Sequence, residues 1–438
     1  VVKLLSPRLP PLLGMLLAGL LLRNIHAAPL SHEVPLLGHS FEWWSLTLRM
    51  MALALIMLRA GLGLDLDKLR AMGAITAKLA CFPCLAEAAS VCLLSGPFLG
   101  LPIAWGGLLG FVIAAVSPAV VVPGMLDLQA RKYGTNKGIP SMVVAAASFD
   151  DVLAIAGFSV CLAIALPSGS SHAHHPLNAD TSSVFEAAEH MSKPFATTAL
   201  GTRVAWLLIK APIELIGGVL AGILIGLGVG GLPFHGVGTL LHSIAVIGAG
   251  LLCVFGGRTV DFGGGGVLAT VVLGCVASRC WGAKLRQPVQ AHVNSLWNLA
   301  QPMLFGLLGS SVNLRVIEED QLRGGVGLLV CAILVRLIVT RLVTIPCMMP
   351  YFCVRPASSS SLTATEAKFV CIAWLPKATV QAAVGSMALD KVMELGLEQV
   401  QEERAKLVLT LSVLVILMTA PLGAIGIAIA GPKLLTHD

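Results

Sequence analysis

The feature that most constrains this chain is a succession of apolar segments, each about long enough to cross a bilayer as a helix. About twelve of them follow one another from one end of the sequence to the other. Only 12% of the 438 residues are charged, about half the fraction of soluble globular domains. Since a bilayer accepts only backbones that satisfy their own hydrogen bonds, segments of this length must be helical. The sequence therefore predicts an all-α polytopic membrane protein.

The segments and their loops also predict an orientation. The segments cover residues 9–22, 43–64, 71–99, 103–126, 138–166, 204–231, 240–256, 265–280, 292–312, 325–350, 368–389 and 406–430. Basic residues gather in alternate loops, around 68–70, 131–137 and 279–286, whereas 318–320 is acidic. The positive-inside rule places the basic loops and both termini in the cytoplasm. This topology also explains the small net charge of +6, which argues against a nucleic-acid partner.

Ionisable side chains inside the apolar segments are the candidate functional residues. Those that stand out are Glu87, the adjacent pair Asp150 and Asp151, Arg336 and Lys377. A charge at the centre of a membrane helix costs roughly 2.5–3.5 kcal/mol. Such a residue is therefore retained where it faces the protein interior, an ion-pair partner or water.

Two of the apolar segments are interrupted by proline. Pro118 and Pro123 lie late in 103–126, and Pro376 lies in the middle of 368–389. A proline removes one amide donor and frees a carbonyl one turn earlier, so the helix unwinds or kinks. In a bilayer this is tolerated only where the freed groups are buried in protein or line an aqueous cavity. The sequence therefore predicts two broken helices.

The charges and the breaks form a unit that occurs twice. Glu87 and Arg336 are 249 residues apart, and Pro118 and Pro376 are 258 apart. The two copies begin on opposite sides of the membrane, as an inverted repeat requires. Matching interruptions in two halves point to a secondary transporter with its site near the midplane.

This repeat divides the chain, which we treat as one transporter unit over residues 1–430. A core domain is expected from helices within 71–166 and 325–430. A second, dimerising or scaffold domain is expected from helices within 1–64 and 204–312.

Several motifs together resemble the monovalent cation:proton antiporters, and within them the animal sodium/hydrogen exchangers of family 9, subfamily B. They are RAGLGLDLDKL (59–69), VSPAVVVPGML (116–126), SFDDVLAI (148–155), QPMLFGLLGSSV (301–312) and WLPKATVQAAVGSMALD (374–390). The resemblance covers about residues 50–430. It implies a homodimer, and a six-helix core with two crossing, partly unwound helices that moves as an elevator past the dimer domain. It also implies exchange of Na⁺ or Li⁺ for H⁺.

The resemblance assigns roles to individual residues. Asp150 and Asp151 match the ion-binding pair, and transported Na⁺ is the metal they would hold. Glu87 and Arg336 match an intramembrane charge pair with a structural or gating role. The helix crossing falls at Pro118–Pro123 and at Pro376.

Other groups at the crossing have roles suggested by their chemistry. Lys377 is placed to compensate helix carbonyl ends. Freed backbone carbonyls and the hydroxyls of Ser117, Ser148 or Thr379 are expected to complete the oxygen shell of the cation.

The aspartate pair suggests how exchange is coupled. Adjacent residues on a helix point about 100° apart, so the two carboxylates cannot face one ion together. One is expected to bind the cation while its neighbour orients the site or takes a proton, and which does which stays open. Arg336 effectively cannot deprotonate, so the aspartates must carry the exchange. The number of protons moved per cation stays open too.

Other functions fit less well. An intramembrane aspartyl protease needs two carboxylates from different elements facing one water, so we expect no enzyme, and no cofactor. A transporter of the same architecture that exchanges potassium for protons, or carries an organic anion with sodium, remains the alternative. The membrane of residence stays open between the plasma membrane and organelle membranes such as endosomal or mitochondrial ones.

Three minor features complete the sequence. The Ser- and His-rich stretch 167–203, with His172, His174 and His175, is predicted to be a mobile loop rather than a metal site. The glycines of DFGGGGVLAT (261–270) indicate close helix packing rather than a nucleotide loop. The absence of an initial methionine suggests a truncated N-terminus.

Overall fold

The computed structural model describes residues 11–24, 38–63, 66–166, 213, 216–231, 238–260, 262–312, 319–345 and 362–437. Within those ranges the regular structure is helical, apart from one isolated bridge between Tyr133 and His437. Seven helices there are long and apolar enough to cross a membrane, and three shorter apolar helices accompany them. The predicted all-α membrane architecture is confirmed. The His-rich stretch 167–203 lies outside the described residues.

The helices follow the predicted segments closely. They are α2 (Pro11–Asn24), α3 (Gly38–Gly63), α4 (Leu66–Leu99), α5 (Ile103–Ala114), α6 (Pro118–Ala130), α7 (Ile139–Ala165), the unlabelled helix Ile216–Gly230, α10 (Thr239–Thr259), α11 (Gly263–Cys280), α12 (Ala283–Ser310), α13 (Glu319–Thr344), α14 (Ala364–Ala373), α15 (Thr379–Val384), α16 (Met387–Leu395) and α17 (Gln399–Leu434). Several extend beyond their apolar segments, because the polar first turns of α12 and α17 continue the same helices into the loops.

Both predicted breaks are present. The first segment stops at Ala114 and resumes at Pro118, with residues 115–117 between α5 and α6. Pro118 opens α6, where its missing N–H costs no hydrogen bond. The assignment of Pro123 to the break was wrong: it lies inside α6 on an exposed face. The helix tolerates the one hydrogen bond that Pro123 removes, so the chain does not unwind there.

The second segment breaks between α14 and α15, and the two breaks cross. Residues 374–378 are non-helical, and Pro376 lies among them. The Ser117 amide donates to the Pro376 carbonyl at 2.8 Å. The hydroxyls of Ser117 and Thr379 lie 3.3 Å apart. The two unwound stretches therefore hydrogen-bond to each other through their backbones. Irregular backbone inside a membrane needs such partners.

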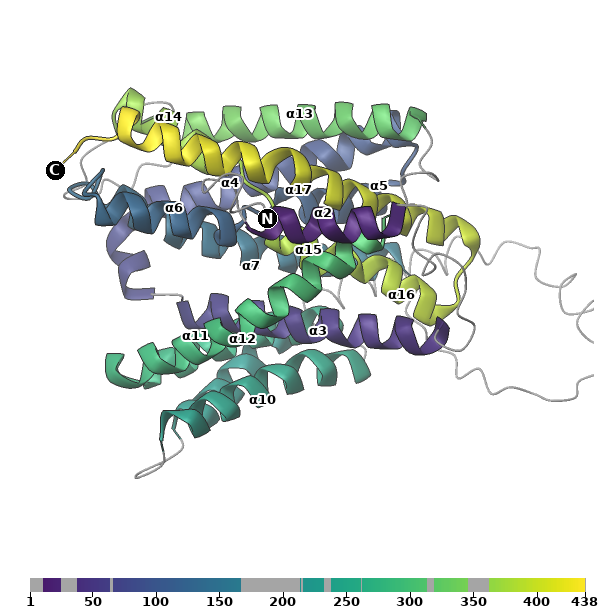
Figure 1. Ribbon diagram of the computed structural model, residues 1–438, viewed down its shortest axis with the longest axis horizontal. Helices are drawn as coiled ribbons and strands as arrows, with labels where there is room; N and C mark the ends of the chain where they lie inside the picture. Colours follow the sequence, from purple (N-terminus) through teal and green to yellow (C-terminus); the bar gives the residue numbers. More distant parts are fainter. Residues whose placement is uncertain are drawn as a thin grey trace, which may run out of the picture.

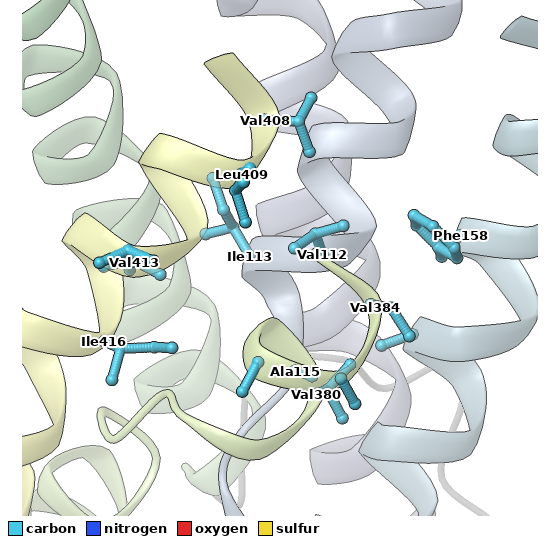
Figure 2. Packing of buried hydrophobic residues seen from close by; sticks show 14 of the residues in the cluster. Val112, Ile113, Ala115, Phe158, Val380, Val384, Val408, Leu409, Val413 and Ile416 are labelled. Atoms are coloured by element: carbon cyan, nitrogen blue, oxygen red, sulfur yellow. The ribbon is translucent and has the colours of Figure 1, made fainter. Parts of the chain in front are cut away.

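Close packing of neighbouring helices holds the crossing in place. A β-carbon at Gly423 of α17 would collide with the ring of Pro376, so only glycine allows this approach. Figure 2 shows Val112, Ile113 and Ala115, at the end of α5, among apolar side chains of α15 and α17. Phe158 of α7 lies beside α15 on the other side.

The helices form two groups. In one, α4 packs along α13, and α5, α6, α7 and α14–α17 surround the crossing. In the other, α2, α3, α10, α11 and α12 pack on one another. Figure 1 shows α13 and α17 along the top of the molecule and α10, α11 and α3 along the bottom. Contacts of α7 with α11, and of α15 with α3 and α12, join the groups.

The glycines near residue 265 serve helix packing, as predicted. A β-carbon at Gly266 of α11 would collide with the Cys253 carbonyl of α10. On the helix Ile216–Gly230, a β-carbon at Gly218 would lie 2.5 Å from the Gly265 carbonyl oxygen. Without side chains at these positions, three helix backbones approach closely, which is how helices associate in lipid.

Candidate functional site

Arg336 lies at the centre of a buried cluster of charges next to the crossing. It projects from α13 and is fully buried. Its Nη1 donates to Glu87 Oε2 at 2.5 Å, and its Nη2 donates to Asp150 Oδ1 at 3.2 Å. Its Nε donates to the Trp374 carbonyl at 3.0 Å, at the second break. The rigid fork of the guanidinium thus joins both carboxylates to the unwound backbone.

Lys377 lies in the second unwound stretch and reaches across to the first. Its Nζ donates to Glu87 Oε2 at 2.6 Å and to the Ala114 carbonyl at 3.1 Å. Arg336 Nη1 also donates to the Ala114 carbonyl. Two cations therefore meet the negative end of the α5 dipole. Lys377 therefore contacts a carbonyl at the end of the other broken helix, and its compensating role stays a prediction.

The two aspartates have different surroundings. Asp150 accepts the Val116 amide at 2.6 Å in addition to the Arg336 guanidinium. Asp151 is 4% exposed, and its Oδ1 has no hydrogen-bond partner among the described residues. Because adjacent side chains on a helix point in different directions, the carboxylate of Asp150 is paired and that of Asp151 is not.

The charges of this cluster nearly balance. Arg336 and Lys377 supply two positive charges, and Glu87 and Asp150 supply two negative ones. Asp151 is the fifth ionisable group, and no ion pair joins it to a described cation. A buried charge must be paired, coordinated to a cation or neutralised. Asp151 therefore needs a cation or a proton to be stable in this site.

The backbone carbonyls at the end of α5 are already occupied. Gln381 Nε2 donates to the carbonyls of Val112, Ile113 and Ala115, at 3.0, 3.3 and 2.9 Å. The Ala114 carbonyl has its two cationic partners. These carbonyls already accept hydrogen bonds from side chains, and the expectation that freed carbonyls complete a cation shell stays a prediction.

The hydroxyls expected in that shell are likewise engaged with one another at Ser117 and Thr379. The side chain of Ser148 lies outside the described part of the chain.

Comparison with known proteins identifies the family of this chain. A family model described as sodium/hydrogen exchanger, transmembrane, matches residues 2–430. The chain belongs to the sodium/hydrogen exchanger family. Members of this family are transporters and not enzymes, as the divergence of the two aspartates led us to expect.

Curated relatives in this exchanger family match over nearly the whole chain. Sodium/hydrogen exchanger 9B2 of Mus musculus is 38% identical over 431 residues, covering 98% of this chain and 69% of the relative. Sodium/hydrogen exchanger 9B1 of Homo sapiens is 36% identical over 435 residues, covering 99% and 74%. The resemblance inferred from the motifs is confirmed.

A solved exchanger structure supports the fold. The sodium proton antiporter MjNhaP1 from Methanocaldococcus jannaschii at pH 8 superposes with a TM-score of 0.71 at 18% identity. The match covers 96% of this chain and 93% of MjNhaP1. At this identity the likeness shows the fold, and it confirms the predicted antiporter fold with its two broken helices.

The sequence did not single out every residue that shapes the site of this exchanger. Gln381 and Thr419 were missed, and Thr419 Oγ1 accepts the Lys377 amide at 3.1 Å. Both are uncharged polar residues inside apolar helices, where a single amide or hydroxyl is common and costs less than a charge. The available signal was the position of Gln381, four residues after Lys377 and close to the second break.

A resident metal site is not indicated. No group of three or more His, Cys, Asp or Glu side chains is arranged to hold a metal ion in the described residues. His172, His174 and His175 lie outside them.

Proposed function

We propose that this protein exchanges Na⁺ or Li⁺ for H⁺ by competition for the Asp151 carboxylate. The observation that carries the proposal is the charge balance of the buried cluster. Four groups neutralise one another, and Asp151 alone lacks a described counter-ion. A carboxylate in that position is satisfied by one proton or by one monovalent cation, but not by both.

Coupling follows from this competition. A carrier whose Asp151 is bare leaves an uncompensated charge in the low dielectric, so it crosses only when loaded. If Asp151 carries a cation in one direction and a proton in the other, the two movements are coupled and no further group is needed. Asp150 then positions the site, because Val116 and Arg336 hold its carboxylate.

The charge balance leads us to expect one proton per cation. Each loaded form carries the same net charge, so the exchange rate in proteoliposomes should not depend on the membrane potential. The measurement is the proton flux driven by Na⁺, Li⁺ or K⁺ gradients, reported by a lumenal pH dye with the voltage clamped by an ionophore. A flux that rises steeply with voltage would contradict one-for-one exchange, because it would show that net charge moves in each cycle.

The same assay tests the competing substrates. Proton flux driven by K⁺ and not by Na⁺ or Li⁺ would mean potassium exchange. Uptake of an organic anion with Na⁺, without proton counterflow, would contradict proton exchange altogether.

We also propose that the two helical groups move past each other as an elevator. The group around the crossing would carry the ion, and α2, α3 and α10–α12 would form the scaffold and the contact with a second copy. Ion pairs connect these groups at the ends that the positive-inside rule places outside. Arg49 of α3 contacts Asp390 of α16 at 2.8 Å, and Arg258 of α10 contacts Glu394 of α16 at 2.7 Å. Sliding of the groups would have to break these pairs.

Crosslinking across this junction is expected to stop transport. Cysteines at Arg49 and Asp390, in a background without native cysteines, would be joined by a short bifunctional thiol reagent. Proton flux should fall to background on crosslinking, because α3 and α16 can then no longer separate.

The matched control joins Glu319 and Arg323, one turn apart on α13 and paired at 2.7 Å. Both lie in one rigid helix, so crosslinking them should leave flux unchanged. Full activity with α3 and α16 joined would rule out relative motion at this junction.

A further inference from the structure

Gln381 is a fully buried polar residue whose side-chain amide donates hydrogen bonds to the end of α5. The two hydrogens of its Nε2 are shared by the carbonyls of Val112, Ile113 and Ala115. Figure 2 shows Val380, its neighbour in sequence, in the same buried apolar cluster as Ala115. The α15 helix thus supplies a side-chain cap for a helix that ends without a backbone cap.

The orientation of this amide follows from its partners. Three carbonyl oxygens surround one end, and an oxygen placed there would be repelled by all three. The NH₂ group therefore faces α5, and Oε1 of Gln381 faces away. That oxygen is buried and has no hydrogen-bond partner among the described residues.

Gln381 and Asp150 hold the same peptide unit from its two sides. The Ala115 carbonyl accepts from Gln381, and the adjacent Val116 amide donates to Asp150 Oδ2 at 2.6 Å. A shift of the amide of Gln381 would move the peptide that orients Asp150. The side chain of Gln381 thus contacts three backbone oxygens, one of which belongs to the peptide that holds Asp150.

The kind of oxygen that an ion meets affects its selectivity. A small cation gains most from a concentrated charge such as a carboxylate, because the Coulomb energy rises as the separation falls. A larger cation is well served by several neutral carbonyl dipoles, as in potassium-channel filters. Withdrawing the α5 carbonyls from the ion leaves Asp151 as the dominant ligand.

We propose that Gln381 is a positioning residue that sets cation selectivity, by capping the α5 carbonyls so that the site favours Na⁺ and Li⁺ over K⁺. The inference rests on the proposed exchange function. It assigns Gln381 no contact with the ion. Its effect is exerted through the Ala115–Val116 peptide and the carbonyls that it occupies.

The test replaces Gln381 by methionine, which has a similar volume and no N–H donor. The ratio of apparent affinities for K⁺ and Na⁺ is expected to rise about threefold to tenfold, the range of one net hydrogen bond. A structural defect alone would lower flux for all cations together and leave this ratio unchanged. A wild-type ratio in a variant that still transports would overturn the proposal.

Two further variants keep the result decisive. Gln381→Asn keeps the amide on a shorter side chain, so its ratio should lie between those of the wild type and Gln381→Met. If the methionine variant does not fold, Gln381→Asn decides alone, and a wild-type ratio there counts against the proposal. The control is Gln129→Met, at an exposed position near the end of α6, which should leave the ratio unchanged.

A second readout separates this proposal from the function on which it rests. Stabilisation against heat by Na⁺, Li⁺ and K⁺ reports cation binding without transport. A wild-type protein that binds cations selectively but drives no proton flux overturns the exchange function alone. Variants of Gln381 with unchanged relative stabilisation overturn the selectivity role alone.

Discussion

Asp151→Asn is expected to reduce cation-driven proton flux to the level of protein-free liposomes while leaving the fold intact. An asparagine can hold neither a proton nor the negative charge that attracts the cation. Because Asp151 has no described ion-pair partner, its replacement strands no other charge. The variant should therefore be at least as stable to heat as the wild type, since the cost of a bare buried carboxylate is removed.

Asp150→Asn tests whether the loss of flux is specific to the Asp151 carboxylate or follows from any polar change in α7. It should also lose flux, but together with stability, because Arg336 and the Val116 amide lose a charged partner. Asp127→Asn is the surface control, since Asp127 is exposed and its pair with Arg131 lies in solvent-accessible surroundings. Wild-type flux in Asp151→Asn would remove that residue from the mechanism.

Glu87→Gln is expected to produce a large loss of stability. Both Arg336 and Lys377 pair with Glu87 Oε2, so the substitution leaves two cations sharing one remaining anion, Asp150. Removing one partner from a buried ion pair typically costs about 3–5 kcal/mol. The measurement is the midpoint of thermal unfolding of the purified protein in detergent, followed by size-exclusion chromatography.

The double variant Glu87→Gln/Lys377→Met checks the charge balance itself. It removes one charge of each sign, so Arg336 and Asp150 remain as a neutral pair. We expect it to be more stable than Glu87→Gln alone, even though it carries one more substitution. Additive losses from the two changes would mean that packing and not charge determines the stability of this cluster.

The fold was predictable in outline because membranes impose strong rules on a sequence. Long apolar segments must be helices, and proline or charge within them is costly enough to be informative. Glu87, Arg336 and Lys377 were found for this reason, and so were the two breaks. Pro123 misled because a proline can remain inside a helix when its ring lies on an exposed face.

The detailed contacts of the site were not predictable in the same way. Which aspartate pairs with Arg336 depends on the rotation of α7 against its neighbours, and this is set by tertiary packing. Gln381 carries no charge, so the free-energy cost of placing it in an apolar helix is too small to identify it as functional. Arg49 and Asp390 are 341 residues apart, and nothing in the sequence indicates that α3 and α16 bring them together.

The approach of Gly423 to Pro376 bears on how sequence variation in this protein should be interpreted. Gly423 carries no polar side chain and lies on α17, outside the charged cluster, yet its missing β-carbon gives the proline ring its place at the crossing. A substitution as mild as alanine would force the Pro376 ring, and with it the second unwound stretch, out of its place. Residue 423 therefore belongs with the charged residues when variants are ranked by their expected harm, although hydropathy and charge would class such a change as silent.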